Sequence, residues 1–201
     1  IVKIGLVGVT KHLYRFATKD IFKFDNPVIE ALGNKIANHL TASSFASQLY
    51  AIKNKLAFPE KYLLLTMFHD IGKMWLLQLI NDFMKFEKQK FELAEEGILE
   101  VFQKLHIPFG VSLLTKWQFD AAYIEIVKKH HNKFDNDNKQ LLVAKFGNLM
   151  AKICGYTEKD TKIDMVSEEM DVFDLLKIRE TSLDKMKEEI EQFMESQKEK
   201  S

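Results

Sequence analysis

The sequence has little of what a disulfide-stabilised, β-rich or nucleic-acid-binding protein needs. Its 201 residues include only 3 Pro, 8 Gly and 1 Cys. A single cysteine cannot form an intramolecular disulfide, which favours a reducing, cytoplasmic location. So few turn-forming residues argue against a fold of many short strands. Lys plus Arg and Asp plus Glu number 29 each, so no bulk charge draws the chain to nucleic acid.

What the chain does contain indicates one all-α domain. Hydrophobic residues make up 46% of the sequence and charged residues 29%, enough for a real core and an ordinary polar surface. Apolar residues recur at three- and four-residue steps in most of the chain, which is the period of amphipathic helices. We therefore predict helices over residues 34–56, 60–70, 74–86, 108–117, 121–131, 140–153 and 181–197. Pro108 is placed in the first turn of its helix.

The apolar stretch Tyr62–Ile80 is long enough to raise the question of a membrane span. It carries His69, Asp70 and Lys73 in its middle, and charged groups there are costly in lipid. We predict instead a buried pair of helices around a polar site, interrupted at Gly72, and no membrane insertion.

His69 and Asp70 are the sharpest chemical feature of that stretch. A buried carboxylate without a partner is costly, and a cation shared with imidazoles would supply one. Imidazole and carboxylate ligands suit iron, manganese, zinc or nickel. Such an ion could generate hydroxide for attack on phosphorus. Taken alone, the pair is better explained by a structural hydrogen bond than by a metal site.

Four more histidines lie on or beside predicted apolar helices, and each has a structural explanation of its own. His39 could be a satisfied core histidine, and His106 could start a helix. His130 and His131 stand at a predicted helix C-terminus, where the helix dipole favours them. Their individual positions therefore do not decide between a structural and a functional role.

Together, these histidines carry a resemblance to a known family. His69-Asp70-Ile71-Gly72-Lys73 resembles the HDIGK signature of HD-domain proteins. The segment from His106 to Trp117 is similar to the H-A-x-V-G-A-x-L-L-x-x-W segment of the HDOD family, the HD-related output domain. That family continues with a helix that ends in a double histidine, here His130-His131. Asn38-His39-Leu40 stands at the family's first histidine, and Ile1–Leu13 resembles its A-I-x-x-L-G segment.

The resemblance covers Ile1 to about Tyr156 and implies an HD-domain-like helical bundle. It implies an HDOD core over residues 1–156 that begins mid-module, without the family's N-terminal helices. Residues 157–201 would be a C-terminal helical extension that packs on the same domain. By analogy with HD phosphohydrolases, it also implies a set of metal-ligand positions: His39, His69, Asp70, His106, His130, His131 and Asn148.

Two departures indicate that this metal site is degenerate. Active HD phosphohydrolases close the site with an aspartate from a later helix, but this chain has Asn148 there. An asparagine offers a neutral oxygen and removes one of two expected carboxylates, so metal affinity should fall. The cyclic-di-GMP-cleaving HD-GYP relatives have a G-Y-P loop after the double histidine. Residues 132–138 contain neither Gly nor Pro.

Three hypotheses remain open. The first is a non-catalytic bacterial signal-transduction module, whose histidine cluster would be a residual metal site, a ligand pocket or part of a polar core. Its partners would be other signalling proteins or a nucleotide messenger, and its last helix could pack on its own domain or on another subunit as a homo-oligomer. The second is an active metal-dependent phosphohydrolase or phosphodiesterase acting on a nucleotide or cyclic dinucleotide, in which Asp70 is catalytic and Lys73 contacts phosphate. The third is a structural helical bundle, which predicts histidines with no shared centre.

Overall fold

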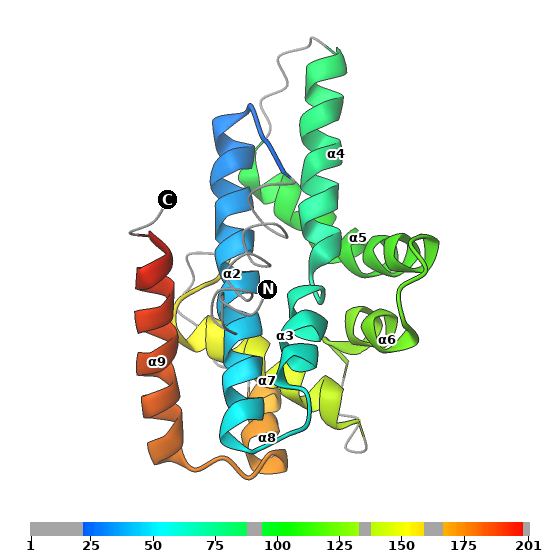
Figure 1. Ribbon diagram of the computed structural model, residues 1–201. Coiled ribbons are helices and arrows are strands. Elements are labelled where there is room, and N and C mark those ends of the chain that lie inside the picture. The colour runs from blue at the N-terminus through cyan, green and yellow to red at the C-terminus, as the bar shows by residue number, and fades with distance from the viewer. Residues whose placement is uncertain (1–21, 88–93, 133–137, 159–166, 199–201) are drawn as a thin grey trace, which may run out of the picture.

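A computed structural model describes residues 22–87, 94–132, 138–158 and 167–198 of the chain. Within these ranges the regular secondary structure is entirely α-helical, which confirms the predicted all-α class (Figure 1). The arrangement is consistent with an HD-like helical bundle. The opening segment Ile1–Leu13, to which part of the family resemblance was assigned, lies outside the described residues, as does most of the loop at 132–138.

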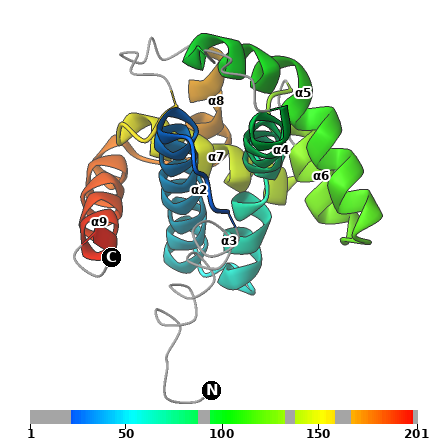
Figure 2. The same cartoon turned by 90° about the horizontal axis from the view of Figure 1, so that it is seen from above.

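Helix α2 (Pro27–Lys53) is the axis of the fold. Asn26 caps it by accepting hydrogen bonds from the backbone N–H groups of Val28 and Ile29, and Pro27 fits the first turn. The helix contacts α3 (Pro59–Met67), α4 (Ile71–Glu87), α7 (Lys139–Ile153) and α9 (Glu180–Lys198). Because it contacts these four helices, α2 is the element around which the described part of the bundle is arranged (Figures 1 and 2).

The remaining helices flank this axis. Helix α5 (Glu95–Lys116) packs against α4, and α6 (Ala121–Lys129) packs against α5 and α7. Asp120 caps α6 by accepting a hydrogen bond from the backbone N–H of Ala122. Helix α8 (Ser167–Leu175) contacts α7, and it falls in a polar stretch for which no helix was predicted.

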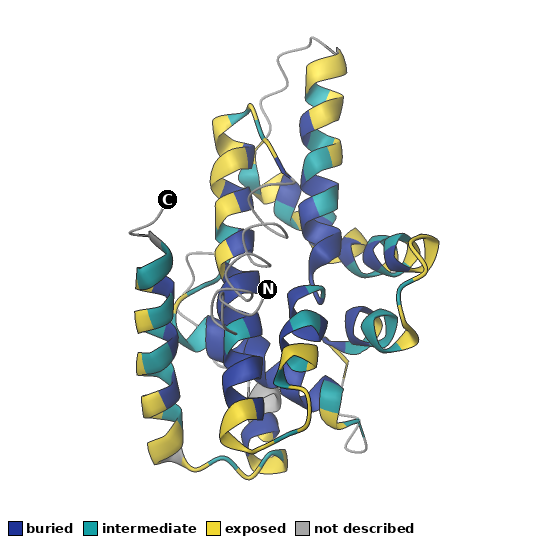
Figure 3. Ribbon diagram, viewed as in Figure 1, coloured by how far each residue is buried: buried dark blue, intermediate teal, exposed yellow. Residues whose placement is uncertain are grey.

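Two hydrophobic clusters lie at opposite ends of α2. One joins its first half to α4, α5 and α6, through residues such as Ile36, Leu77 and Phe102. The other joins its second half to α7, α8 and α9, through residues such as Phe146 and Ile190. Figure 3 shows the resulting buried band through the centre of the molecule. His39 is buried near the middle of α2, close to the point where the first cluster ends and the second begins.

The prediction that Pro108 begins a helix is wrong. Helix α5 runs through Pro108 without ending, from Glu95 to Lys116. A proline in a helix interior removes one hydrogen bond and costs about 3 kcal/mol. Here Ile98 and Phe102 before it and Leu114 after it are all buried. Burial on both sides of the proline is therefore strong enough to carry the helix across it.

Two predicted boundaries also change. Helix α2 begins at Pro27 rather than at residue 34, because Asn26 and Pro27 supply a start signal that the apolar periodicity did not. The break between α3 and α4 is the turn at Phe68, His69 and Asp70, and Gly72 already lies within α4. The turn therefore carries the histidine and the aspartate themselves.

One apolar stretch among the described residues, Pro59–Phe86, is long and apolar enough to cross a membrane by length and composition. It corresponds to α3 and α4, and 67% of its most apolar window is buried inside the protein. Burial of this kind is usual for core helices of a soluble domain, in line with the sequence prediction of a buried helix pair.

Candidate metal centre

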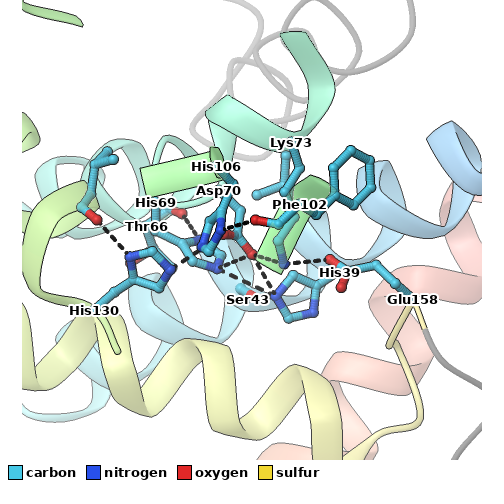
Figure 4. Close-up of polar contacts among 12 residues, drawn as sticks. His39, Ser43, Thr66, His69, Asp70, Lys73, Phe102, His106, His130 and Glu158 are labelled. Atoms are coloured by element: carbon cyan, nitrogen blue, oxygen red, sulfur yellow. Dashed lines mark hydrogen bonds and ion pairs between the residues drawn. The ribbon is translucent and has the colours of Figure 1, made fainter. Parts of the chain in front are cut away.

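Five of the six histidine and aspartate positions singled out from the sequence lie buried in one centre, and the sixth lies on its rim. His39 comes from α2, His106 from the middle of α5 and His130 from the C-terminus of α6. His69 and Asp70 come from the turn between α3 and α4. His131 follows His130 and is exposed. The structural-bundle hypothesis, which predicted scattered histidines, therefore loses its support (Figure 4).

Asp70 is the hub of the centre. Its Oδ1 atom lies 3.5 Å from Nε2 of His106 and 3.3 Å from Nε2 of His130. Its Oδ2 atom lies 3.3 Å from Nε2 of His69 and 3.9 Å from Nε2 of His39. We call Oδ1 of Asp70 together with His106, His130 and His131 the Oδ1 half of the centre. Oδ2 of Asp70 together with His39, His69 and Lys73 is the Oδ2 half. Both halves match groups of side chains whose ligand atoms lie close enough to hold a metal ion.

Backbone carbonyls fix the orientation of the four buried imidazoles. The Nδ1–H groups donate to the carbonyls of Thr66, Phe102, Val127 and Tyr156, at distances of 2.5 to 2.9 Å. In a neutral ring, a protonated Nδ1 leaves a lone pair on Nε2. All four lone pairs therefore point into the centre, and this outer hydrogen bond is the usual companion of a metal-ligating histidine.

The polar atoms of the centre lack enough hydrogen-bond donors. Oδ1 of Asp70 and the Nε2 atoms of His106 and His130 are buried without a hydrogen-bond partner in the described part of the chain. The Nε2 atoms of His39 and His69 face each other at 3.3 Å, although both are acceptors when Nδ1 carries the proton. Buried polar groups normally find partners. A cation would satisfy these atoms together, so the residues present fit a metal ion.

Electrostatics keep the centre in the state that a metal requires. Burial, with the neighbouring His69 ring as the second cause, lowers the pKa of His39 to about 4. Burial also lowers the pKa of His106 and of His130. For Asp70, burial alone would raise the pKa, but Lys73 and His69 outweigh it and hold the pKa well below its ordinary value. Neutral imidazoles and an ionised carboxylate are the ligand forms that bind transition metals.

Lys73 is buried beside Asp70 and is held by two carboxylates. Its Nζ donates to Oδ2 of Asp70 and to Oε1 of Glu158, both at 2.7 Å. Burial would lower the pKa of Lys73, but these two carboxylates outweigh it and raise the pKa above its ordinary value. The centre therefore contains one positive charge supplied by the protein itself.

Glu158 and Tyr156 were not predicted from the sequence. Both follow α7 in the segment after Gly155, whose φ of +81° ends the helix. The Tyr156 carbonyl orients His39, and Glu158 holds Lys73. A polar stretch without periodicity carries no signal for these roles. Only a count of charges around a buried lysine would have suggested a second carboxylate.

Asn148 is buried in α7, the helix that packs against α2. Among the described residues, no hydrogen bond joins it to the histidines or to Asp70. Its assignment as the degenerate ligand position therefore stays a prediction. If Asn148 does stand at the ligand position, its side chain is a neutral amide, and Asp70 is then the one carboxylate among the predicted metal ligands.

A close approach of two helices sets the position of His106. A Cβ on Gly72 would overlap the backbone carbonyl of His106, and one on Gly110 would lie 3.4 Å from the backbone nitrogen of Gly72. Helices α4 and α5 therefore cross at these glycines, with backbone against backbone. This crossing places His106 within reach of Asp70, which lies just before α4.

Comparison with known proteins agrees with these features. A family model described as the HDOD domain matches residues 1–133, which include His39, His69, Asp70, His106, His130 and His131. No curated protein and no solved structure shows significant similarity to the chain. The matched region covers about two thirds of the sequence and spans every histidine of the centre. The chain therefore belongs to the HDOD domain family.

Proposed function

We propose that this chain is a regulatory signal-transduction module whose histidine centre binds a metal ion but does not hydrolyse phosphoesters. Family membership supports a signalling role related to HD domains. The observation that carries the proposal is the shortage of negative charge. Among the described residues, Asp70 is the one carboxylate in the candidate ligand groups, and Lys73 already neutralises one of its oxygens.

The shortage of charge argues against catalysis for a physical reason. A metal ion bound by the imidazoles and Asp70 would supply Lewis acidity and a more acidic bound water. The chain's own groups would have to orient that water and accept its proton. Lys73 binds Oδ2 of Asp70 and also Glu158, and Oδ1 of Asp70 would itself be a metal ligand, so neither carboxylate would be free to act as a base.

An active phosphodiesterase is the alternative. It is favoured by the two groups of candidate ligands that share Asp70, because two ions about 3.5–4 Å apart are a common arrangement in phosphoester hydrolysis. In that case Lys73 would have to leave Glu158 to reach a substrate phosphate.

Turnover separates the two functions. Metal-stripped protein would be loaded in turn with Mn²⁺, Fe²⁺, Zn²⁺ and Ni²⁺ and assayed on a generic aryl phosphodiester, beside His69→Ala. We expect no hydrolysis above that of the variant. Hydrolysis by the unchanged protein that is lost in His69→Ala would overturn the proposal. Asn148→Asp tests the cause, because a restored carboxylate should tighten metal binding if this position belongs to the site.

Partners of the module would be other signalling proteins or a nucleotide messenger. A protein partner is supported by three exposed apolar residues on one face of α4, Leu79, Phe83 and Phe86, with Phe86 84% exposed. Their spacing of four and three residues places them on a single stripe. Apolar stripes left exposed in this way are characteristic of interaction surfaces.

A further inference from the structure

The two carboxylate oxygens of Asp70 have different partners. Oδ2 accepts a hydrogen bond from the Lys73 ammonium at 2.7 Å. Oδ1 is buried and has no hydrogen-bond partner among the described residues, and the same holds for the Nε2 atoms of His106 and His130 beside it. One half of the centre therefore already contains a cation, and in the other half three buried acceptor atoms have no donor among the described residues.

Lys73 is fixed in the Oδ2 half. Glu158 binds its ammonium from the side opposite Asp70, and only 11% of the lysine side chain is exposed (Figure 4). A divalent ion placed between Oδ2, His39 and His69 would lie beside this ammonium and be repelled by it. The Nε2 atom of His39 is also the most distant from Asp70, at 3.9 Å, and lies 3.5 Å from the Ser43 hydroxyl, which can donate to it.

The Oδ1 half has the geometry of a metal site. In a tetrahedral site with bonds of about 2.0–2.1 Å, neighbouring ligand atoms lie about 3.3 Å apart. The distances from Oδ1 to the Nε2 atoms of His130 and His106 are 3.3 and 3.5 Å. The His131 ring packs 4.0 Å from the His130 ring and 5.2 Å from the His106 ring, centroid to centroid, and His131 is exposed. It could provide a further ligand where an ion would enter.

From these contrasts we infer that the centre binds a single divalent transition-metal ion, held in the Oδ1 half by Asp70, His106, His130 and His131. Lys73 takes the place of a second ion in the Oδ2 half, and Glu158 keeps it there. The inference rests on the metal-binding centre of the proposed function and specifies where the ion lies and how many are bound.

Two buried histidines provide a matched test. His130 and His39 both donate Nδ1–H to a backbone carbonyl, at 2.9 and 2.8 Å, but they lie in opposite halves. The full chain would be stripped of metal and titrated with Zn²⁺ by calorimetry, and its ions counted by elemental analysis. We expect one ion per chain. His130→Gln should weaken Zn²⁺ binding at least 100-fold, whereas His39→Gln should change it less than about 3-fold.

Co²⁺ provides a second readout, because its visible spectrum reports the ligand geometry. A tetrahedral Co²⁺ spectrum should persist in His39→Gln and disappear in His130→Gln. Lys73→Met removes the internal cation with little change of volume, and it should raise the count from one Zn²⁺ to two. Circular dichroism checks the fold of each variant, and His106→Gln replaces His130→Gln if the latter does not fold.

Three outcomes would each overturn the inference. The unchanged chain could bind two ions, or no ion at millimolar Zn²⁺. Alternatively, His39→Gln could lose the ion while His130→Gln retains it. Failure of the proposed function is a separate result. A chain that binds one ion and hydrolyses phosphodiesters contradicts only the regulatory proposal, and a chain that binds two ions without hydrolysis contradicts only the stoichiometry.

Discussion

The two halves of the histidine centre are built from the same kinds of side chain but differ in how their charges are balanced. In the Oδ2 half, the negative oxygen is paired with Lys73, which Glu158 binds in turn. In the Oδ1 half, three buried acceptor atoms meet without any donor from the described chain. The difference shows that a shared ligand pattern does not make two positions equivalent. Whether each half can bind a metal ion depends on whether the protein already places a cation of its own there.

Asp70→Asn should have the largest effect, because this residue belongs to both halves. Among the described residues, the change leaves the buried Lys73 with Glu158 as its one carboxylate partner, and removing one member of a buried charge pair costs about 3–5 kcal/mol. We expect the free energy of unfolding to fall by that amount and Zn²⁺ binding to be lost. Urea denaturation and calorimetry measure the two effects. Asp184→Asn, at an exposed position on α9, should change neither.

Acid should weaken both halves together. The pKa of His39 is lowered from 6.5 to about 4 in the folded protein, and the pKa values of His106 and His130 are lowered as well. Between pH 4 and pH 6.5, His39 binds a proton in the unfolded chain but not in the folded chain. Stability is therefore complete above about pH 6.5 and falls as the pH drops toward 4, by on the order of 3 kcal/mol.

Denaturation curves at a series of pH values measure this dependence, with metal removed throughout. A free energy of unfolding that is flat from pH 6.5 to pH 4 would contradict the burial of neutral imidazoles. His39→Gln should flatten part of the curve, which separates the contribution of the Oδ2 half from that of the Oδ1 half.

Gly72→Ala should disturb the Oδ1 half selectively. The new Cβ would meet the His106 carbonyl, so α4 and α5 must separate and His106 must move away from Asp70. Overpacking of this kind costs about 1–3 kcal/mol. We expect weaker Zn²⁺ binding together with lower stability. Gly97→Ala is the matched control, since a Cβ there meets nothing within 4 Å and alanine favours the helix by up to about 1 kcal/mol.

Glu158→Gln should have the smallest effect and should act on the Oδ2 half. It removes one of the two carboxylates that hold Lys73, and only 18% of the Glu158 side chain is exposed. We expect a loss of about 1 kcal/mol in stability. The ion pair between Lys53 and Glu189 has the same 2.7 Å length but is exposed, so Glu189→Gln should cost less than about 0.5 kcal/mol. Equal losses in the two variants would contradict the buried role of Glu158.

The parts of this structure that could be predicted from the sequence are those with a strong local pattern. Periodic apolar residues predicted α6, α7 and α9 closely, and the family resemblance brought the histidines into one centre. Pro108 was misplaced because local preference for a helix start lost to burial along the whole of α5. Glu158 and Tyr156 were missed because their roles depend on how the chain turns after α7, and no periodic pattern describes that turn.

The short segment after Gly155 has a consequence for where the domain ends. The family match stops at residue 133, and α7 ends at Ile153. A chain cut after Ile153 would keep every histidine of the centre, yet His39 would lose the acceptor that orients its ring, and Lys73 would keep Asp70 but lose Glu158. Such a fragment would still contain every residue of the family motifs, but its centre would be less rigid. The functional unit therefore extends at least to Glu158, because the His39–Tyr156 and Lys73–Glu158 hydrogen bonds both depend on this segment.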